Sequence, residues 1–141
     1  ALHEPNPDFI KYSIEYSKGD LALEAAAEYI NNNRKAIFKD LKRRNINNYI
    51  ESNNRLFSLI KPLRIIYPKA KIIHIVRDGR DYVRSGMGRE WYTKHDKRPR
   101  LKASFFPEDP YYNRWENMNR FEKICWRWQK KDNFIYKDNS S

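Results

Sequence analysis

The sequence predicts an α/β fold in which a parallel sheet is flanked by helices. The run IIHIV at residues 72–76 is continuous and rich in β-branched residues, which is typical of a strand covered on both faces. Helical patterns precede and follow this run, as in chains that alternate helices with parallel strands. Hydrophobic residues make up 40% of the 141 positions, enough for a folded core. We expect a single domain over residues 1–141.

The first third of the chain predicts an extended start followed by helices. Residues 1–9 contain two prolines and predict an extended segment or loop, in which Leu2 can close a strand. A turn at residues 19–20 also offers a helix cap. The Ala- and Glu-rich residues 21–33 predict a helix, and a second helical piece is expected at residues 34–44, after a cluster of asparagines.

The remaining elements follow from short periodic patterns. Residues 47–52 are a strand candidate, and the apolar spacing of residues 55–67 predicts a helix that Pro62 kinks or splits. A helix of two or three turns is expected within residues 80–92, before two glycines weaken it. An irregular basic loop follows, and aromatic residues spaced three or four apart predict a last helix at residues 111–131.

The charge balance points to anionic partners. The chain has 29 Lys and Arg against 18 Asp and Glu, a net charge of +11, so nucleic acids, nucleotide phosphates and acidic substrates are all compatible. No run reaches the roughly 18 apolar residues of a membrane span. The three histidines, His3, His74 and His95, are scattered along the chain and predict no metal site. Within its run, His74 is expected to be a packed core residue.

The junction after residue 76 is the strongest candidate for chemistry. Ligands of parallel sheets bind beyond the carboxyl ends of the strands, where the next helix presents free backbone N–H groups. Arg77 falls at this place, Gly79 permits a close backbone approach, and Ser85 can offer a hydroxyl to the same anion. The alternative is that Arg77 pairs with Asp78 or Asp81 to fix the turn. The residues alone do not decide between the two.

Residues 67–89, YPKAKIIHIVRDGRDYVRSGMGR, resemble the segment of sulfotransferases that holds the 3′-phosphate of 3′-phosphoadenylyl sulfate. The resemblance implies a P-loop nucleotide-hydrolase-like architecture without a metal ion. It also implies that Arg77 and Ser85 bind the 3′-phosphate of this co-substrate. Gly79 stands where proline is commoner in the family, a change that preserves a turn.

A second resemblance involves HEPNPDF at residues 3–9. Some sulfotransferases that act on carbohydrates have a strand ending in a basic residue and a glutamate, and that glutamate removes the acceptor proton. By this resemblance Glu4 is the candidate catalytic base, with His3 as a competitor. The alternative is a surface glutamate beside a proline turn.

The glycine-containing phosphosulfate loop of sulfotransferases has no counterpart here. Glycines occur only at positions 19, 79, 86 and 88, and none follows an apolar strand in such a loop. We therefore expect an incomplete sulfotransferase domain. The whole protein would transfer a sulfuryl group to a hydroxyl or amine of an unidentified acceptor, with a carbohydrate as one candidate, and the 141-residue piece alone would do so poorly or not at all.

Two other functions remain open at this point. The sequence WYTKHDKRPRLK at residues 91–102 mixes aromatic and basic residues, as in nucleic-acid-binding modules. A substrate-side or solvated insertion explains it better, so no specific nucleic-acid partner is predicted. A P-loop nucleotide kinase fragment is less favoured because the Gly-Lys-Ser/Thr signature is missing.

Overall fold

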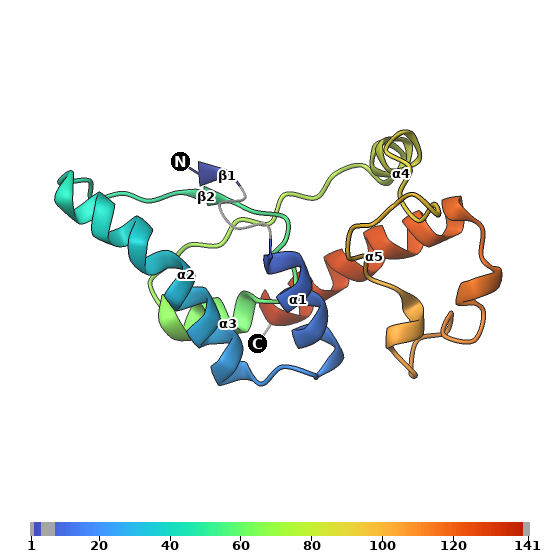
Figure 1. Ribbon diagram of the computed structural model, residues 1–141, viewed down its shortest axis with the longest axis horizontal. Coiled ribbons are helices and arrows are strands. Elements are labelled where there is room, and N and C mark those ends of the chain that lie inside the picture. The colour runs from blue at the N-terminus through green and yellow to red at the C-terminus, as the bar shows by residue number, and fades with distance from the viewer. Residues whose placement is uncertain (1, 4–7, 140–141) are drawn as a thin grey trace. The chain divides into compact units, whose positions relative to one another are not determined.

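The computed structural model describes residues 2–3 and 8–139, and the chain divides into two compact units, Ala1–Lys71 and Ile72–Ser141 (Figure 1). Helices and a parallel strand pair are both present, which confirms the mixed helix and strand character of the prediction in its coarse form. The sheet is much smaller than expected, because its two strands have two residues each.

Two helices build the frame of the first unit. Helix α1 (Phe9–Lys18) was not predicted; it ends at Gly19, whose φ of 82° is a left-handed conformation that glycine adopts without strain. Helix α2 (Leu23–Arg43) is continuous, so the predicted interruption at the asparagines is wrong. Asparagine is a modest helix former, and packing of the apolar face of α2 outweighs this preference.

The strands and the third helix complete this unit. Strand β1 (Leu2–His3) pairs in parallel with β2 (Glu51–Ser52), with Leu2 opposite Glu51, so strands occur near both predicted places. Helix α3 (Ile60–Ile66) begins five residues later than predicted. Pro62 lies in its first turn, where a backbone N–H has no intrahelical acceptor, so the proline does not kink it. The core consists of Phe9, Ala26, Ile30, Leu56 and Leu59.

The predicted buried strand at residues 72–76 is wrong. In the second unit this segment has no secondary structure, and the side chains of Ile73 and Ile75 are 83% and 86% exposed. A β-branched run becomes a strand only where neighbouring strands accept its backbone hydrogen bonds. In the part of the chain that the structure describes, no strand pairs with residues 72–76.

The second unit packs two helices and two short 3₁₀ turns. Helix α4 (Gly79–Gly88) is close to the predicted one and packs on α5 (Arg120–Asn139). The turns η1 (Ala103–Phe105) and η2 (Trp115–Asn117) lie in the connection between these helices. Helix α5 starts nine residues later than the predicted 111–131 helix. Its buried residues are therefore Ile124, Trp126 and Arg127, while Phe121 of the expected apolar stripe is 57% exposed.

Tight packing holds α4 against the rest of this unit. Val83, Trp91 and Ile124 form a buried cluster. A Cβ atom at Gly86 would lie 2.7 Å from Trp91 Cε3 and 2.9 Å from Ile124 Cγ2, so only glycine allows this approach of α4. The position of α4, and of the residues before and after it, is thereby fixed within the unit.

Candidate functional site

Arg77 is held by its backbone while its side chain remains free. The indole Nε1 of Trp128 donates a hydrogen bond of 3.0 Å to the carbonyl oxygen of Arg77. The Arg77 side chain is exposed. Within residues 2–3 and 8–139 its guanidinium forms no ion pair or hydrogen bond. Arg77 therefore presents an available positive charge next to the start of α4.

The neighbouring carboxylates are already paired with other arginines. Asp78 accepts hydrogen bonds from the Arg80 guanidinium, at 3.1 Å and 2.9 Å, and from the Arg80 backbone N–H at 2.8 Å. These bonds from Arg80 lower the pKa of Asp78 to about 2. Asp81 pairs with Arg84 at 3.4 Å. The alternative pairing of Arg77 with Asp78 or Asp81 is not what the structure has.

The cap of α4 changes the expected source of anion affinity. Asp78 is the N-cap residue, and its carboxylate accepts hydrogen bonds from the backbone N–H groups of Arg80 and Asp81 in the first turn of the helix. The N–H groups expected to be free at this helix start are therefore largely engaged by Asp78. An anion here would depend on the Arg77 side chain, with the helix dipole as a secondary contribution.

Ser85 lies on the same helix as this start. It is the seventh residue of α4 and half-buried, about 9 Å along the helix axis from Gly79 at the usual rise per residue. Its hydroxyl has no hydrogen bond to any of the described residues. A Cβ atom at Gly79 would lie 3.4 Å from the indole ring of Trp128, so Gly79 packs directly against this ring. The close approach predicted for Gly79 is thus to Trp128.

The candidate base Glu4 lies outside the described residues. Its competitor His3 is exposed in β1, opposite Ser52 of β2. His3 belongs to the first unit, whereas Arg77 and Ser85 belong to the second.

A histidine–aspartate pair was missed by the sequence-based reasoning. His74 Nε2 lies 3.2 Å from Asp132 Oδ1 on α5, and the ring of Tyr136 packs edge-on against the imidazole with centroids 5.8 Å apart. His74 is thus half-buried beside a carboxylate, and not the packed sheet residue that was predicted. In this pair the carboxylate fixes the orientation of the imidazole ring. No signal could have found it, because the two residues are 58 positions apart.

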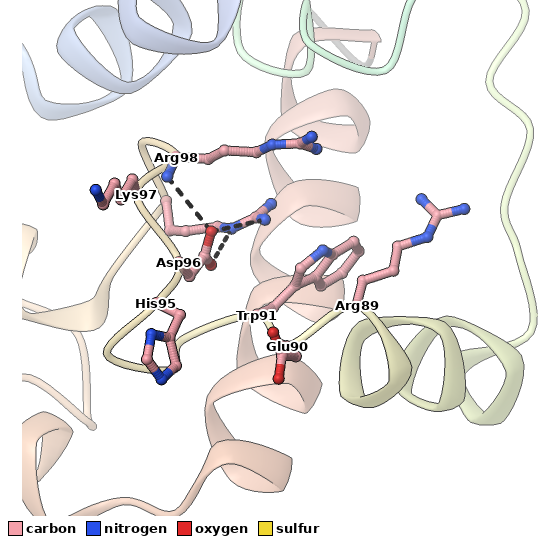
Figure 2. Close-up of a pocket in the computed structure, with 8 residues that line it drawn as sticks. Arg89, Glu90, Trp91, His95, Asp96, Lys97 and Arg98 are labelled. Atoms are coloured by element: carbon pink, nitrogen blue, oxygen red, sulfur yellow. Dashed lines mark hydrogen bonds and ion pairs between the residues drawn. The ribbon is translucent and has the colours of Figure 1, made fainter.

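A pocket of about 680 Å³ lies in the basic loop after α4 (Figure 2). In the view of Figure 2, Trp91 lies between Arg89 at the start of the loop and Asp96 farther along it. The lining contains four cationic side chains and two carboxylates, and consists of Arg89, Glu90, Trp91, His95, Asp96, Lys97, Arg98 and Arg100. Most of these residues belong to the segment 91–102, whose mixture of aromatic and basic residues resembles that of nucleic-acid-binding modules.

Among residues 2–3 and 8–139, no group of three His, Cys, Asp or Glu side chains could hold a metal ion. Over the same residues, no helix has the length and apolarity needed to span a bilayer.

Comparison with known proteins gives no match: neither a protein-family model, nor a curated protein, nor a solved structure is significantly similar to this chain.

Proposed function

We propose that this chain is the 3′-phosphate-binding part of a sulfotransferase that uses 3′-phosphoadenylyl sulfate. In this proposal the chain belongs to a P-loop nucleotide-hydrolase-like domain and contains only some of its elements. The whole protein would transfer the sulfuryl group to a hydroxyl or amine acceptor. The proposal rests on the sequence of residues 67–89 together with the free guanidinium of Arg77.

The single observation that supports it most is the division of charge around the start of α4. Arg80 and Arg84 are engaged with Asp78 and Asp81, whereas Arg77 is unpaired in the described structure. A guanidinium fixed by its backbone and left without a carboxylate suits a phosphate, to which it can donate two parallel hydrogen bonds. In the proposed complex, the phosphate bridges the Arg77 guanidinium and the Ser85 hydroxyl, with the long arginine side chain folded along α4.

The proposed reaction is an in-line displacement at sulfur. A bond forms between sulfur and the acceptor oxygen or nitrogen while the bond from sulfur to the bridging phosphate oxygen breaks. A base takes the acceptor proton, and adenosine 3′,5′-bisphosphate leaves with the electron pair of the broken bond. Glu4 is the proposed base, with His3 as the alternative. Arg77 and Ser85 contribute by holding the donor through a phosphate that does not react.

The test compares two nucleotides that differ in one phosphate. Calorimetry at fixed salt should show that the chain binds adenosine 3′,5′-bisphosphate at least about tenfold more tightly than adenosine 5′-monophosphate. One charged hydrogen-bonding contact contributes about 1.5–3 kcal/mol, and about 1.4 kcal/mol corresponds to a factor of ten. Equal affinity for the two nucleotides would show that the 3′-phosphate is not recognised and would overturn the proposal.

A further inference from the structure

The loop that follows α4 is held in place by hydrogen bonds to its backbone. The backbone N–H of Trp91 donates to the Gly86 carbonyl at 3.1 Å, and the Arg120 guanidinium donates to the carbonyls of Trp91 and Met87, both at 3.0 Å. The Tyr92 hydroxyl donates to the Leu101 carbonyl and so ties the two ends of the loop together. These hydrogen bonds hold the loop against α4 and α5 within the second unit.

Its backbone carries strain on both sides of Trp91. Glu90 has a φ of 56° and Tyr92 a φ of 62°, a left-handed conformation that residues with a side chain rarely adopt. Such strain persists where the surrounding contacts enforce it, and it is concentrated at ligand-binding sites.

Within the pocket, one carboxylate is fully engaged in holding the loop. Asp96 accepts from Arg100 Nε at 2.7 Å and from the backbone N–H of Tyr92 at 2.9 Å. Burial raises the pKa of Asp96, and the hydrogen bonds from Arg100 and Tyr92 outweigh this effect, so that its pKa is lowered. Asp96 and Arg100 neutralise each other and make no net contribution to the charge of the pocket.

The remaining charge of the pocket is positive and unpaired. Arg89, Lys97 and Arg98 form no ion pair with any described residue, and Glu90 is the one remaining carboxylate among the lining residues. The buried Arg127 lies 4.6 Å from the centroid of the ring of Trp91, which lines the pocket. Over the described residues Arg127 has no carboxylate partner, and its Nε has no hydrogen bond. Exposed and buried charges together give the pocket a positive potential.

The aromatic residues of this loop are not arranged for stacking on nucleobases. Trp91 is only 9% exposed, and the Arg100 guanidinium lies 4.8 Å from its ring centroid. Tyr92 is half-buried, with its hydroxyl bonded to Leu101. Proteins that bind single-stranded nucleic acids use exposed rings on which bases stack. A volume of about 680 Å³ lies within the range of small-molecule sites.

We propose that the pocket formed by Arg89, Trp91, Lys97 and Arg98 binds a small molecule through an oxyanion, either a sulfate ester or a carboxylate. The guanidinium group of Arg98 is the donor to the oxyanion. The side chains of Lys97 and Arg89 point to opposite sides of the pocket (Figure 2) and contribute through their positive charge. This site is separate from the one proposed for the 3′-phosphate and does not depend on it.

The test uses defined probes and a control in the same loop. Binding of glucose 6-sulfate, glucuronate, inorganic sulfate and neutral glucose to the full chain is followed by two-dimensional amide NMR at fixed ionic strength. Arg98→Gln removes one donor from the pocket. Lys94→Gln removes the same charge from an exposed position of the loop that does not line the pocket. Both side chains are exposed, so both variants retain the fold.

We expect glucose 6-sulfate or glucuronate to shift the amide signals of residues 89–100, and neutral glucose to leave them unchanged. Arg98→Gln should weaken this binding about tenfold, and Lys94→Gln less than twofold. Affinity for adenosine 3′,5′-bisphosphate should be the same in both variants. A response to sulfate esters alone identifies a sulfate ester as the ligand class, and a response to glucuronate alone identifies a carboxylate.

Three outcomes would overturn the proposal. The first is the absence of any shift with every anionic probe at millimolar concentration. The second is an equal effect of Arg98→Gln and Lys94→Gln, which would indicate unspecific attraction to the net charge. The third is tighter binding of a twelve-nucleotide oligo(dT) than of either sugar, which would support the nucleic-acid alternative.

Discussion

Two buried arginines, one in each unit, differ in whether a carboxylate neutralises their charge. Arg34 is 2% exposed and forms a bidentate pair with Glu51, with Nε 2.7 Å from Oε2. Glu51 also accepts from the Tyr49 hydroxyl and Asn53 Nδ2, each at 2.7 Å. Arg127 is 5% exposed and has aromatic neighbours, with the Tyr82 hydroxyl as its acceptor. The charge of Arg34 is neutralised by a carboxylate of its own unit, whereas Arg127 has no carboxylate partner among the described residues.

The comparison separates structural cations from those available to a ligand. Arg34 connects α2 to β2, and no charge is left for a partner. The same distinction holds around α4, where Arg80 and Arg84 are paired and Arg77 is not. A net charge of +11 therefore says less about binding than the list of cations without a carboxylate.

Removing the carboxylate of the balanced pair should have the largest effect. Glu51→Ala leaves Arg34 buried without a counter-charge and should lower the free energy of unfolding by about 3–5 kcal/mol. Asp40→Ala is the control, because its partners Arg43 and Arg44 are exposed, and it should cost less than about 1 kcal/mol. Urea unfolding followed by circular dichroism measures both changes. Equal losses would show that the Arg34–Glu51 pair has no special structural role.

The unbalanced arginine should be easier to replace. Arg127→Leu removes a buried charge that has no carboxylate partner, so the free energy of unfolding should change by less than about 1.5 kcal/mol in either direction. Arg34→Leu should cost more, about 3 kcal/mol, because it leaves the Glu51 carboxylate unpaired. The same urea experiment compares the two. A cost for Arg127→Leu as large as that for Arg34→Leu would remove the contrast between the units.

The smallest effect concerns the pair at the start of α4. Carboxyl NMR should report a pKa of about 2 for Asp78, and Arg80→Gln should raise it toward the ordinary value of about 3.9. Because the folded-state pKa is lowered, the stabilisation is complete above about pH 4 and is lost as the pH falls through about 2. Arg84→Gln should leave the pKa of Asp78 unchanged. An ordinary pKa in the wild type would mean that Arg80 is as free as Arg77.

Local patterns predicted several elements of the fold correctly. Helix α4 follows from the break at Asp78 and Gly79 and the two later glycines, and most of α2 follows from its Ala- and Glu-rich start. Helix α1 was missed although Phe9 and Ile14 of its sequence FIKYSIEYSK are buried on one face, because its β-branched and aromatic residues are only modest helix formers. Helices α2 and α4 could be predicted because they depend mainly on residues that are close in sequence.

The failures concern features that depend on distant residues. Residues 72–76 have the composition of a buried strand, but burial requires partner strands, and composition does not supply them. His74 and Asp132 meet only because the segment before α4 runs along α5. The basic residues of the loop were visible in the sequence, whereas the pairing of Arg100 with Asp96, and the resulting freedom of Arg98, were not. The sequence can list the charges of a site, but the fold decides which of them are neutralised.

The most direct test of the account is a nucleotide-binding cycle at Arg77. Calorimetry at fixed salt compares wild type, Arg77→Ala and the control Arg84→Ala with adenosine 3′,5′-bisphosphate and with adenosine 5′-monophosphate. Arg77→Ala should weaken binding of the bisphosphate by about 10- to 100-fold and leave the monophosphate unaffected, while Arg84→Ala should change neither. The same bisphosphate affinity in wild type and Arg77→Ala would contradict the assignment of Arg77.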